Sequence, residues 1–398
     1  MNRNQSVQYS KIGILSISHM LNDFYSNYLP QMLPFLVVLH PEFTATRAAI
    51  LISAFTITSS FFQPLFGFFL DRAGKRWFVY VGTLWMAVML SLTGLIQNYW
   101  LLVTFSALAG LGTAAFHPQA STMVNVLSGD HKAVLLSGFV AFGNFGFALG
   151  PLILIPLFQA YGLEATVITV IPGLLVAIIL AFFAPKNNIL SGSTPPLSVV
   201  IRSLQSASRE LVAIIGVIAI RSLAYTGLLT MLPLYFKSEN VSNIVAGHLL
   251  TIMLAAGAIG GIIGGFISDY YGRKRLIVGS LVLSTPMFFG FFYTQGLLST
   301  IFLALAGAAL LSSFSVTVIA AQEAIPNNKA LAAGLTMGFA GGIGGLAVVL
   351  IGRIADTWGL SAAIFVLFLL PIVAGLIALG MKSRPAARFQ RSLAVKTN

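Results

Sequence analysis

The chain has 398 residues, of which 57% are hydrophobic and only 8% are charged, and its formal net charge is +12. Soluble domains carry about 25% charged residues, so this composition excludes an ordinary water-soluble fold and favours a protein embedded in a lipid bilayer. Because the chain has no cysteine, disulfide frameworks and thiolate metal sites are excluded as well.

Long apolar runs recur from one end of the chain to the other. A helix needs about 20 such residues to cross the hydrocarbon core. We therefore predict an all-α membrane protein with twelve transmembrane helices. Their expected ranges are 12–39, 46–70, 77–97, 100–123, 133–160 and 163–184, then 211–236, 243–268, 275–296, 297–321, 330–355 and 360–381.

One long polar connection, 185–210, divides the predicted helices into two sets of six. It contains Pro195, Pro196, several serines and charged residues that include Arg202, Arg209 and Glu210. We predict an N-terminal six-helix bundle over 1–184, a cytoplasmic linker over 185–210, and a C-terminal six-helix bundle over 211–398 that ends in a short basic tail.

A short motif occurs once in each predicted bundle. The first copy contains Gly67, Asp71, Arg72, Gly74 and Arg76, and the second contains Gly265, Asp269, Gly272 and Arg273. The leading glycines of the two copies are 198 positions apart, as are the aspartates. Parallel repeats are one of the two known plans of secondary transporters, so the sequence predicts two pseudo-symmetric halves with the same orientation.

The positions of Lys and Arg predict how the chain lies in the membrane. If both termini are cytoplasmic, 18 of the 22 cations face the cytoplasm; Arg47, Lys237 and Arg353 lie near the outside, and Arg221 lies inside a span. This bias follows the positive-inside rule. It predicts cytoplasmic termini, and it explains the basic net charge by the lipid bilayer rather than by a nucleic-acid partner.

Taken together, the twelve spans in two halves and the repeated motif resemble the major facilitator superfamily along the whole chain. In that family the repeated motif is a conformational latch, so the resemblance implies that its residues hold the halves together on the cytoplasmic side and release them as they move. A helix cap with a positive-inside anchor is an alternative compatible with this role.

The predicted fifth span adds Gly146, Gly150 and Pro151, which look like the antiporter motif of the drug/proton exchangers in the superfamily. Closer still, four segments resemble the fosmidomycin-resistance branch: Ser18-His19-Met20-Leu21-Asn22-Asp23, Phe116-His117-Pro118, Gly143-Asn144-Phe145-Gly146 and Ala321-Gln322-Glu323. This branch implies efflux of small hydrophilic antimicrobials from a bacterial cell through the inner membrane, driven by inward proton flow.

Two acidic residues are the candidates for proton coupling. Ionisable groups inside a span cost at least ~2.5–3.5 kcal/mol and mark functional sites by default. Asp23 lies about 11 residues into the first predicted span, and His19, Asp23 and Asn27 share one helix face because they follow at four-residue steps. We predict Asp23 as the main protonation site with His19 beside it, and Glu323 as a cytoplasmic gate or second proton site. A structural hydrogen bond of Asp23 and a solvated Glu323 are the alternatives.

Arg221 lies at a similar depth in the seventh predicted span and corresponds through the repeat to Asn22. Arginine does not deprotonate in proteins, so its charge must be met by Asp23, by an anionic substrate, or by each in turn. Alternation between the two would produce an antiporter. A permanent structural salt bridge is the alternative.

Further polar residues at spanning depth are predicted to contact the substrate. His117 directly precedes Pro118, so it either binds substrate and relays protons or is a neutral histidine held by a carbonyl freed at a proline kink. The other predicted substrate ligands are Asn22, Asn27, Tyr25, Tyr225, Gln63 and Asn144.

These observations predict a transporter that works by alternating access and exports a small polar, anionic compound in exchange for protons. A proton symporter that imports a sugar or an organic anion is the first alternative, and a membrane-embedded enzyme or lipid-handling protein is the second. No metal-ligand cluster, phosphate-binding loop or hydrolytic triad is visible in the sequence, so no metal or cofactor is expected. Each chain is expected to contain a complete pathway and to function as a monomer.

Overall fold

The structure is a computed structural model that describes residues 7–73, 76–185, 202, 204–326, 332 and 334–383, without the side chains of 67–73, 130 and 132–134. Helices make up nearly all of this part of the chain, and it contains no strand. Inside hydrocarbon the backbone has no water to bond with, and a helix satisfies its N–H and C=O groups within one segment. The predicted all-α membrane class is therefore confirmed.

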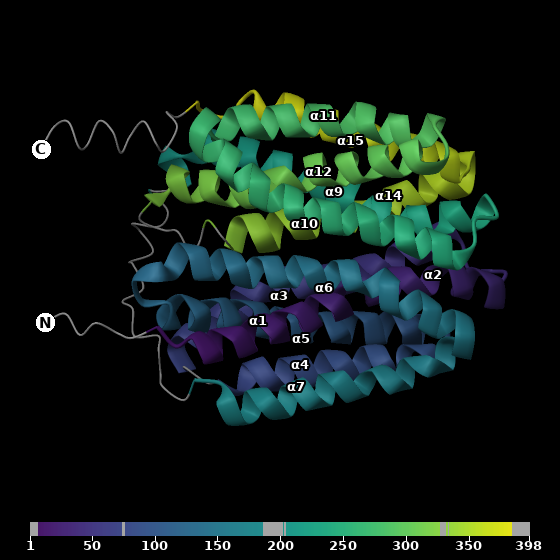
Figure 1. Cartoon of the computed structure of the whole chain (residues 1–398), viewed down its shortest axis with the longest axis horizontal. Coiled ribbons are helices and arrows are strands. Elements are labelled where there is room, and N and C mark those ends of the chain that lie inside the picture. The colour runs from purple at the N-terminus through teal and green to yellow at the C-terminus, as the bar shows by residue number, and fades with distance from the viewer. Residues whose placement is uncertain are drawn as a thin grey trace, which may run out of the picture. The chain divides into compact units, whose positions relative to one another are not determined.

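The chain forms two compact units, and the first comprises Met1–Ser193 with Pro233–Thr251. Figure 1 labels its main helices. They are α1 (Tyr9–Ser26), α2 (Tyr28–Leu39), α3 (Ala45–Ala73), α4 (Trp77–Ser91), α5 (Tyr99–Leu127), α6 (Lys132–Tyr161) and α7 (Val170–Phe183), with short 3₁₀ segments η1 (Thr93–Leu95), η2 (Gly129–His131) and η3 (Leu163–Thr169).

The second unit comprises Thr194–Leu232 with Ile252–Asn398, so the division between units passes through α9 (Ser208–Ser238) and α10 (Asn243–Tyr271). Its remaining elements are α11 (Arg273–Tyr293), α12 (Gly296–Ala324), η5 (Gly334–Ala340), α14 (Gly341–Trp358) and α15 (Leu360–Ala378). Of the predicted linker, residues 186–201 and 203 lie outside the described part of the chain.

Eleven helical segments of the described chain are long and apolar enough to cross a membrane. The first predicted span, 12–39, is divided into α1 and α2, which meet at Asn27. Many large apolar side chains remain exposed, among them Phe182, Phe266 and Leu350. In water such a surface would be strongly unfavourable, whereas a bilayer solvates it.

In the first unit, α1 lies at the centre of the helix packing. It contacts α4, α5, α6 and α7, and the side chains of Tyr25 and Tyr28 are fully buried at its end and at the start of α2. In the second unit, α11 packs against α12 and α15, and α14 packs against α15. The polar residues of α1 are consequently held inside the first unit by helices on several sides.

The segment before α14 differs from a regular helix. The sequence predicts one continuous span over 330–355, but Gly334–Ala340 forms a π-helical segment ahead of α14. Gly344 in α14 packs directly on the backbone of α9 near Ala219 and Leu223, which shows how small residues let these helix backbones approach closely.

Candidate functional site

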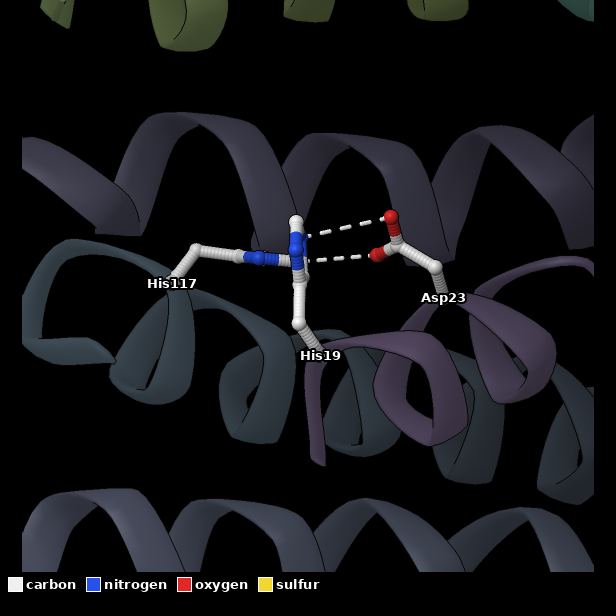
Figure 2. A group of neighbouring side chains, drawn as sticks. All are labelled: His19, Asp23 and His117. Carbon is white, nitrogen blue, oxygen red and sulfur yellow. Dashed lines mark ion pairs between the residues drawn. The ribbon is translucent and has the colours of Figure 1, made fainter. Parts of the chain in front are cut away.

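The candidate site lies in the first unit, where α1 meets α5 and α6. His19 and Asp23 are one turn apart on α1, and His117 comes from α5 (Figure 2). Nε2 of His19 lies 3.4 Å from Oδ2 of Asp23, and Nε2 of His117 lies 3.3 Å from Oδ1 of the same carboxylate. His19 and Asp23 are buried and His117 is half-buried. Two imidazole rings therefore bracket one carboxylate in a largely enclosed site.

The second ring nitrogen of His19 determines where that ring carries its hydrogen. Nδ1 lies 2.7 Å from the carbonyl oxygen of Phe139 on α6. A carbonyl oxygen only accepts hydrogen bonds, so Nδ1 must donate. In the neutral ring Nε2 then presents a lone pair to Asp23, and the contact between Nε2 and Oδ2 is attractive only when one proton lies between them. This arrangement can hold one exchangeable proton.

The packing of α1 on α6 explains why these groups meet. His19 and Asn27 each bond to a carbonyl oxygen of α6, at Phe139 and at Phe147, and both pairs are separated by 120 positions. The two helices therefore run in parallel with matching faces in contact. The expectation that His19, Asp23 and Asn27 share one face of α1 is confirmed.

Gly143 lies on α6 at the same offset from Asp23. A Cβ atom at this position would collide with Oδ2 of Asp23 and would stand 2.5 Å from Cε1 and 2.8 Å from Nε2 of His19. The absence of a side chain thus makes room for the carboxylate and the imidazole. In the sequence, Gly143 stands out only as part of a family segment, because nothing in a single sequence shows which residue of α1 it faces.

The predicted antiporter motif lies in the same contact between α1 and α6. Gly146 packs against the main chain of Met20, and a Cβ at Gly150 would lie 3.1 Å from Nδ2 of Asn27. Pro151 is inside α6, which continues on both sides of it. The motif therefore brings the two helices together along the polar face of α1, and its part in antiport stays a prediction.

Two predicted substrate ligands on α1 are bonded to neighbouring helices of the first unit. Nδ2 of Asn22 donates to the carbonyl oxygen of Ser18 at 2.9 Å and to Oγ1 of Thr83 on α4 at 3.0 Å. The hydroxyl of Tyr25 donates to the carbonyl oxygen of Thr169 in η3. These bonds stabilise the packing of α1, and a substrate-binding role for either residue stays a prediction.

Arg221 is buried in the second unit, on α9. Its Nη1 donates to Oγ of Ser313 at 3.3 Å and to Oγ1 of Thr317 at 3.1 Å, both on α12, and Cζ lies 4.8 Å from the ring centroid of Phe314. Among the described residues of its own unit, no carboxylate forms an ion pair with it. Within the described part of this unit, the groups in contact with the guanidinium are neutral. The sequence analysis did not identify Ser313 and Thr317, although their four-residue spacing in an apolar span was a usable signal.

The remaining predicted substrate ligands are distributed over three helices. Gln63 lies on α3, Asn144 on α6 and Tyr225 on α9, and all three are half-buried. Asn144 directly follows Gly143, and Tyr225 is one turn after Arg221. Their substrate-binding roles stay predictions.

The second copy of the repeated motif forms an ion-pair group. Nη1 of Arg273 lies 2.6 Å from Oδ1 of Asp269, and Nε of Arg273 lies 3.4 Å from Oε1 of Glu323. Nη1 also donates to Oγ of Ser268 at 2.5 Å. Arg273 thus connects the ends of α10 and α12. Glu323 is exposed and forms an ion pair with it.

Little of the first copy is described. Gly74 lies outside the described residues, and the side chains of Asp71 and Arg72 and the surroundings of Gly67 are likewise not described. Arg76 donates from Nη1 to the carbonyl oxygen of Ala184 at 3.1 Å. The latch role of both copies stays a prediction.

A chain of membrane-spanning helices with a buried ionisable group in each unit has the characteristics of a secondary transporter. The family model of the Major Facilitator Superfamily matches residues 15–348. The chain belongs to this superfamily and is a transporter embedded in a membrane.

Individual relatives agree with this assignment. The chain is 31% identical over 384 residues to the uncharacterized MFS-type transporter YfnC of Bacillus subtilis (strain 168), covering 93% of this chain and 92% of that protein. It is 27% identical over 372 residues to the fosmidomycin resistance protein of Escherichia coli (strain K12), covering 91% and 90%. A crystal structure of the nucleoside transporter NupG has the same fold, with a TM-score of 0.77 at 12% identity, covering 93% of this chain and 99% of that one.

Proposed function

We propose that the protein is a proton-coupled antiporter that exports a small polar anion from the cytoplasm by alternating access. The observation that carries the proposal is the contact between Nε2 of His19 and Oδ2 of Asp23 at 3.4 Å. Nδ1 of His19 must donate to the carbonyl of Phe139. The contact between Nε2 and Oδ2 is therefore attractive only when one proton lies between these two atoms.

The proton on this contact sets the charge of the site. With the proton present, and with His117 neutral and donating from Nε2 to Asp23, the three side chains carry no net charge. When the proton leaves, one negative charge remains in a buried position, where it is unfavourable without compensation. Loading and release of the proton therefore change the net charge of this buried site. A coupling site requires such a change.

Arg221 supports an anionic substrate. A buried guanidinium needs an anion or several strong acceptors, and here its described neighbours in the unit are the hydroxyls of Ser313 and Thr317 and the ring of Phe314. A phosphonate, phosphate or carboxylate would accept hydrogen bonds from the guanidinium and neutralise its charge, which the two neutral hydroxyls do not. The geometry of planar arginine suits such oxyanions.

The direction of transport and the substrate class rest on similarity. The Escherichia coli relative is described as a fosmidomycin resistance protein, and MdtG of Salmonella paratyphi A, 26% identical over 252 residues, is described as a multidrug resistance protein. We propose export in the same sense for this chain, across the bacterial inner membrane, with both termini in the cytoplasm and with one chain as the functional unit.

Inverted membrane vesicles with an acidified lumen test this proposal. Fosmidomycin or a related small phosphonate is added outside, and proton release from the lumen is followed with a pH-sensitive dye. We expect release that depends on the substrate in the wild type and none in Asp23→Asn. Release in Asp23→Asn at the wild-type rate would contradict the coupling site. If no phosphonate causes release from wild-type vesicles, the proposed substrate class is wrong.

A further inference from the structure

The three side chains of the site in the first unit have the composition and spacing of a metal-binding site. We propose that His19, Asp23 and His117 bind one zinc-class dication, such as Zn²⁺ or Co²⁺, with the Asp23 carboxylate and the two imidazole nitrogens as protein donors and a solvent ligand in the fourth position. A second part of the proposal, which rests on the proposed function, is that the bound ion excludes the exchangeable proton and stops transport.

The distances between donor atoms suit a four-coordinate ion. One ligand atom from each residue lies within 4.8 Å of the others, and the two nitrogen–oxygen contacts measure 3.4 and 3.3 Å. In a tetrahedral zinc site with bonds of about 2.0–2.1 Å, neighbouring donors are about 3.3 Å apart. Each imidazole nitrogen therefore already lies at about this distance from one oxygen of the Asp23 carboxylate.

The surroundings of His19 match those of a metal-binding histidine. The N–H of the second ring nitrogen in such a histidine donates a hydrogen bond to a carbonyl or carboxylate, which orients the ring toward the ion. Nδ1 of His19 makes this bond to the carbonyl oxygen of Phe139 at 2.7 Å. The Phe139 ring also stacks on the imidazole, with centroids 4.0 Å apart. His19 is therefore held with Nε2 directed at Asp23.

The donor set selects the class of ion. Imidazole nitrogens favour zinc and related transition metals, whereas magnesium and calcium prefer sites made only of oxygen. One carboxylate would leave a charge of +1 on a bound dication, and an anion from solvent would offset it on the side of half-buried His117. Within the described chain, no other group of this kind brings three such residues together.

An ion at this position would have two consequences. It would connect α1, which carries His19 and Asp23, to α5, which carries His117. It would also use the lone pair of Nε2 and the carboxylate oxygen between which the exchangeable proton lies, because metal ligands must be deprotonated. Binding of the ion and loading of the proton therefore exclude each other.

Metal binding is tested on the purified full-length chain in detergent after removal of any affinity tag. Co²⁺ is titrated at one fixed pH while its visible absorption is recorded, and Zn²⁺ is titrated by calorimetry. We expect one equivalent to bind to the wild type, with the absorption of four-coordinate Co²⁺. We expect His117→Gln and Asp23→Asn to weaken binding at least tenfold. His40→Gln, which changes a histidine paired with Glu42 at 3.6 Å, is the matched control and should bind as the wild type does.

A second variant gives a signal that loss of folding cannot imitate. Because the chain has no cysteine, a thiolate-to-Co²⁺ charge-transfer band in His117→Cys can come only from position 117. Appearance of this band supports the site. If that variant elutes as a folded monodisperse protein and lacks the band, or if the wild type binds Co²⁺ no better than a His19→Gln, His117→Gln double variant, the metal site is rejected.

The transport part has its own measurement. Zn²⁺ added to the inverted vesicles should stop the substrate-dependent proton release, and a chelator should restore it. Full release at a Zn²⁺ concentration that saturates the purified protein would overturn the competition while leaving the metal site intact. Conversely, metal binding stands by itself if no proton exchange is found, since it is measured without transport.

Discussion

Nδ1 of His19 donates a hydrogen bond over 2.7 Å to the carbonyl oxygen of Phe139, 120 positions further along the chain. A backbone carbonyl cannot donate, so this bond determines which nitrogen of His19 faces Asp23 without its hydrogen. The bond also fixes the ring on the contact between α1 and α6, where Asn27 and Phe147 repeat the same offset.

Two substitutions of His19 distinguish the roles of its two ring nitrogens. His19→Asn keeps a donor near Nδ1 for the Phe139 carbonyl but removes Nε2, whereas His19→Gln keeps a polar group toward Asp23 and loses the bond to Phe139. A hydrogen bond to a charged group contributes about 1.5–3 kcal/mol, so we expect both variants to lower substrate-dependent proton exchange about tenfold or more. Only His19→Gln should also lower thermal stability. Wild-type exchange in His19→Asn would show that Nε2 is not needed.

Gly143→Ala is expected to disrupt the site by steric conflict. The added methyl group would collide with the carboxylate of Asp23 and the ring of His19, and overpacking of this kind typically costs about 1–3 kcal/mol. Transport and thermal stability of the purified protein are measured together. Gly138→Ala, in the same helix with open space around its Cβ position, is the control and should equal or slightly exceed the wild type in stability. Equal behaviour of the two variants would contradict the close approach of α6.

Arg221→Gln should abolish transport of anionic substrates, and Arg221→Lys should restore only part of it, because a lysine lacks the planar fork of donors. Thr317→Val removes one hydroxyl acceptor from Nη1 and should have a smaller effect, about 0.5–1.5 kcal/mol or severalfold in substrate affinity. Substrate binding to the purified protein is measured by calorimetry. If Arg221→Gln binds the anion as tightly as the wild type, Arg221 has only a structural role.

Glu323→Gln distinguishes a gate from a second proton site. Glu323 forms an exposed ion pair with Arg273 at 3.4 Å, and exposed pairs contribute little to stability. We expect the variant to change the rate of transport and to keep the same number of protons exchanged per substrate molecule. That ratio is obtained by recording dye response and radiolabelled substrate in the same vesicles. A lower ratio would make Glu323 a second proton site.

The sequence by itself determined the class of the protein. An apolar segment that crosses a bilayer satisfies its backbone hydrogen bonds by forming a helix, so the lengths of the apolar runs predicted the membrane helices. The repeated glycine–aspartate motif and the short family segments predicted the superfamily. The shared face of His19, Asp23 and Asn27 also followed from sequence, because helical periodicity is a local property.

The tertiary structure decided which residues from different helices meet. His117 lies 3.3 Å from Asp23 although 94 positions separate them, and only the packing of α5 beside α1 makes them partners. The sequence analysis also did not predict the π-helical segment ahead of α14 or the division of the first span at Asn27. Gly143 is the clearest case. Gly143 leaves room for the side chains of Asp23 and His19. Only the packing of α6 on α1 brings these residues together, and nothing in the local sequence shows it.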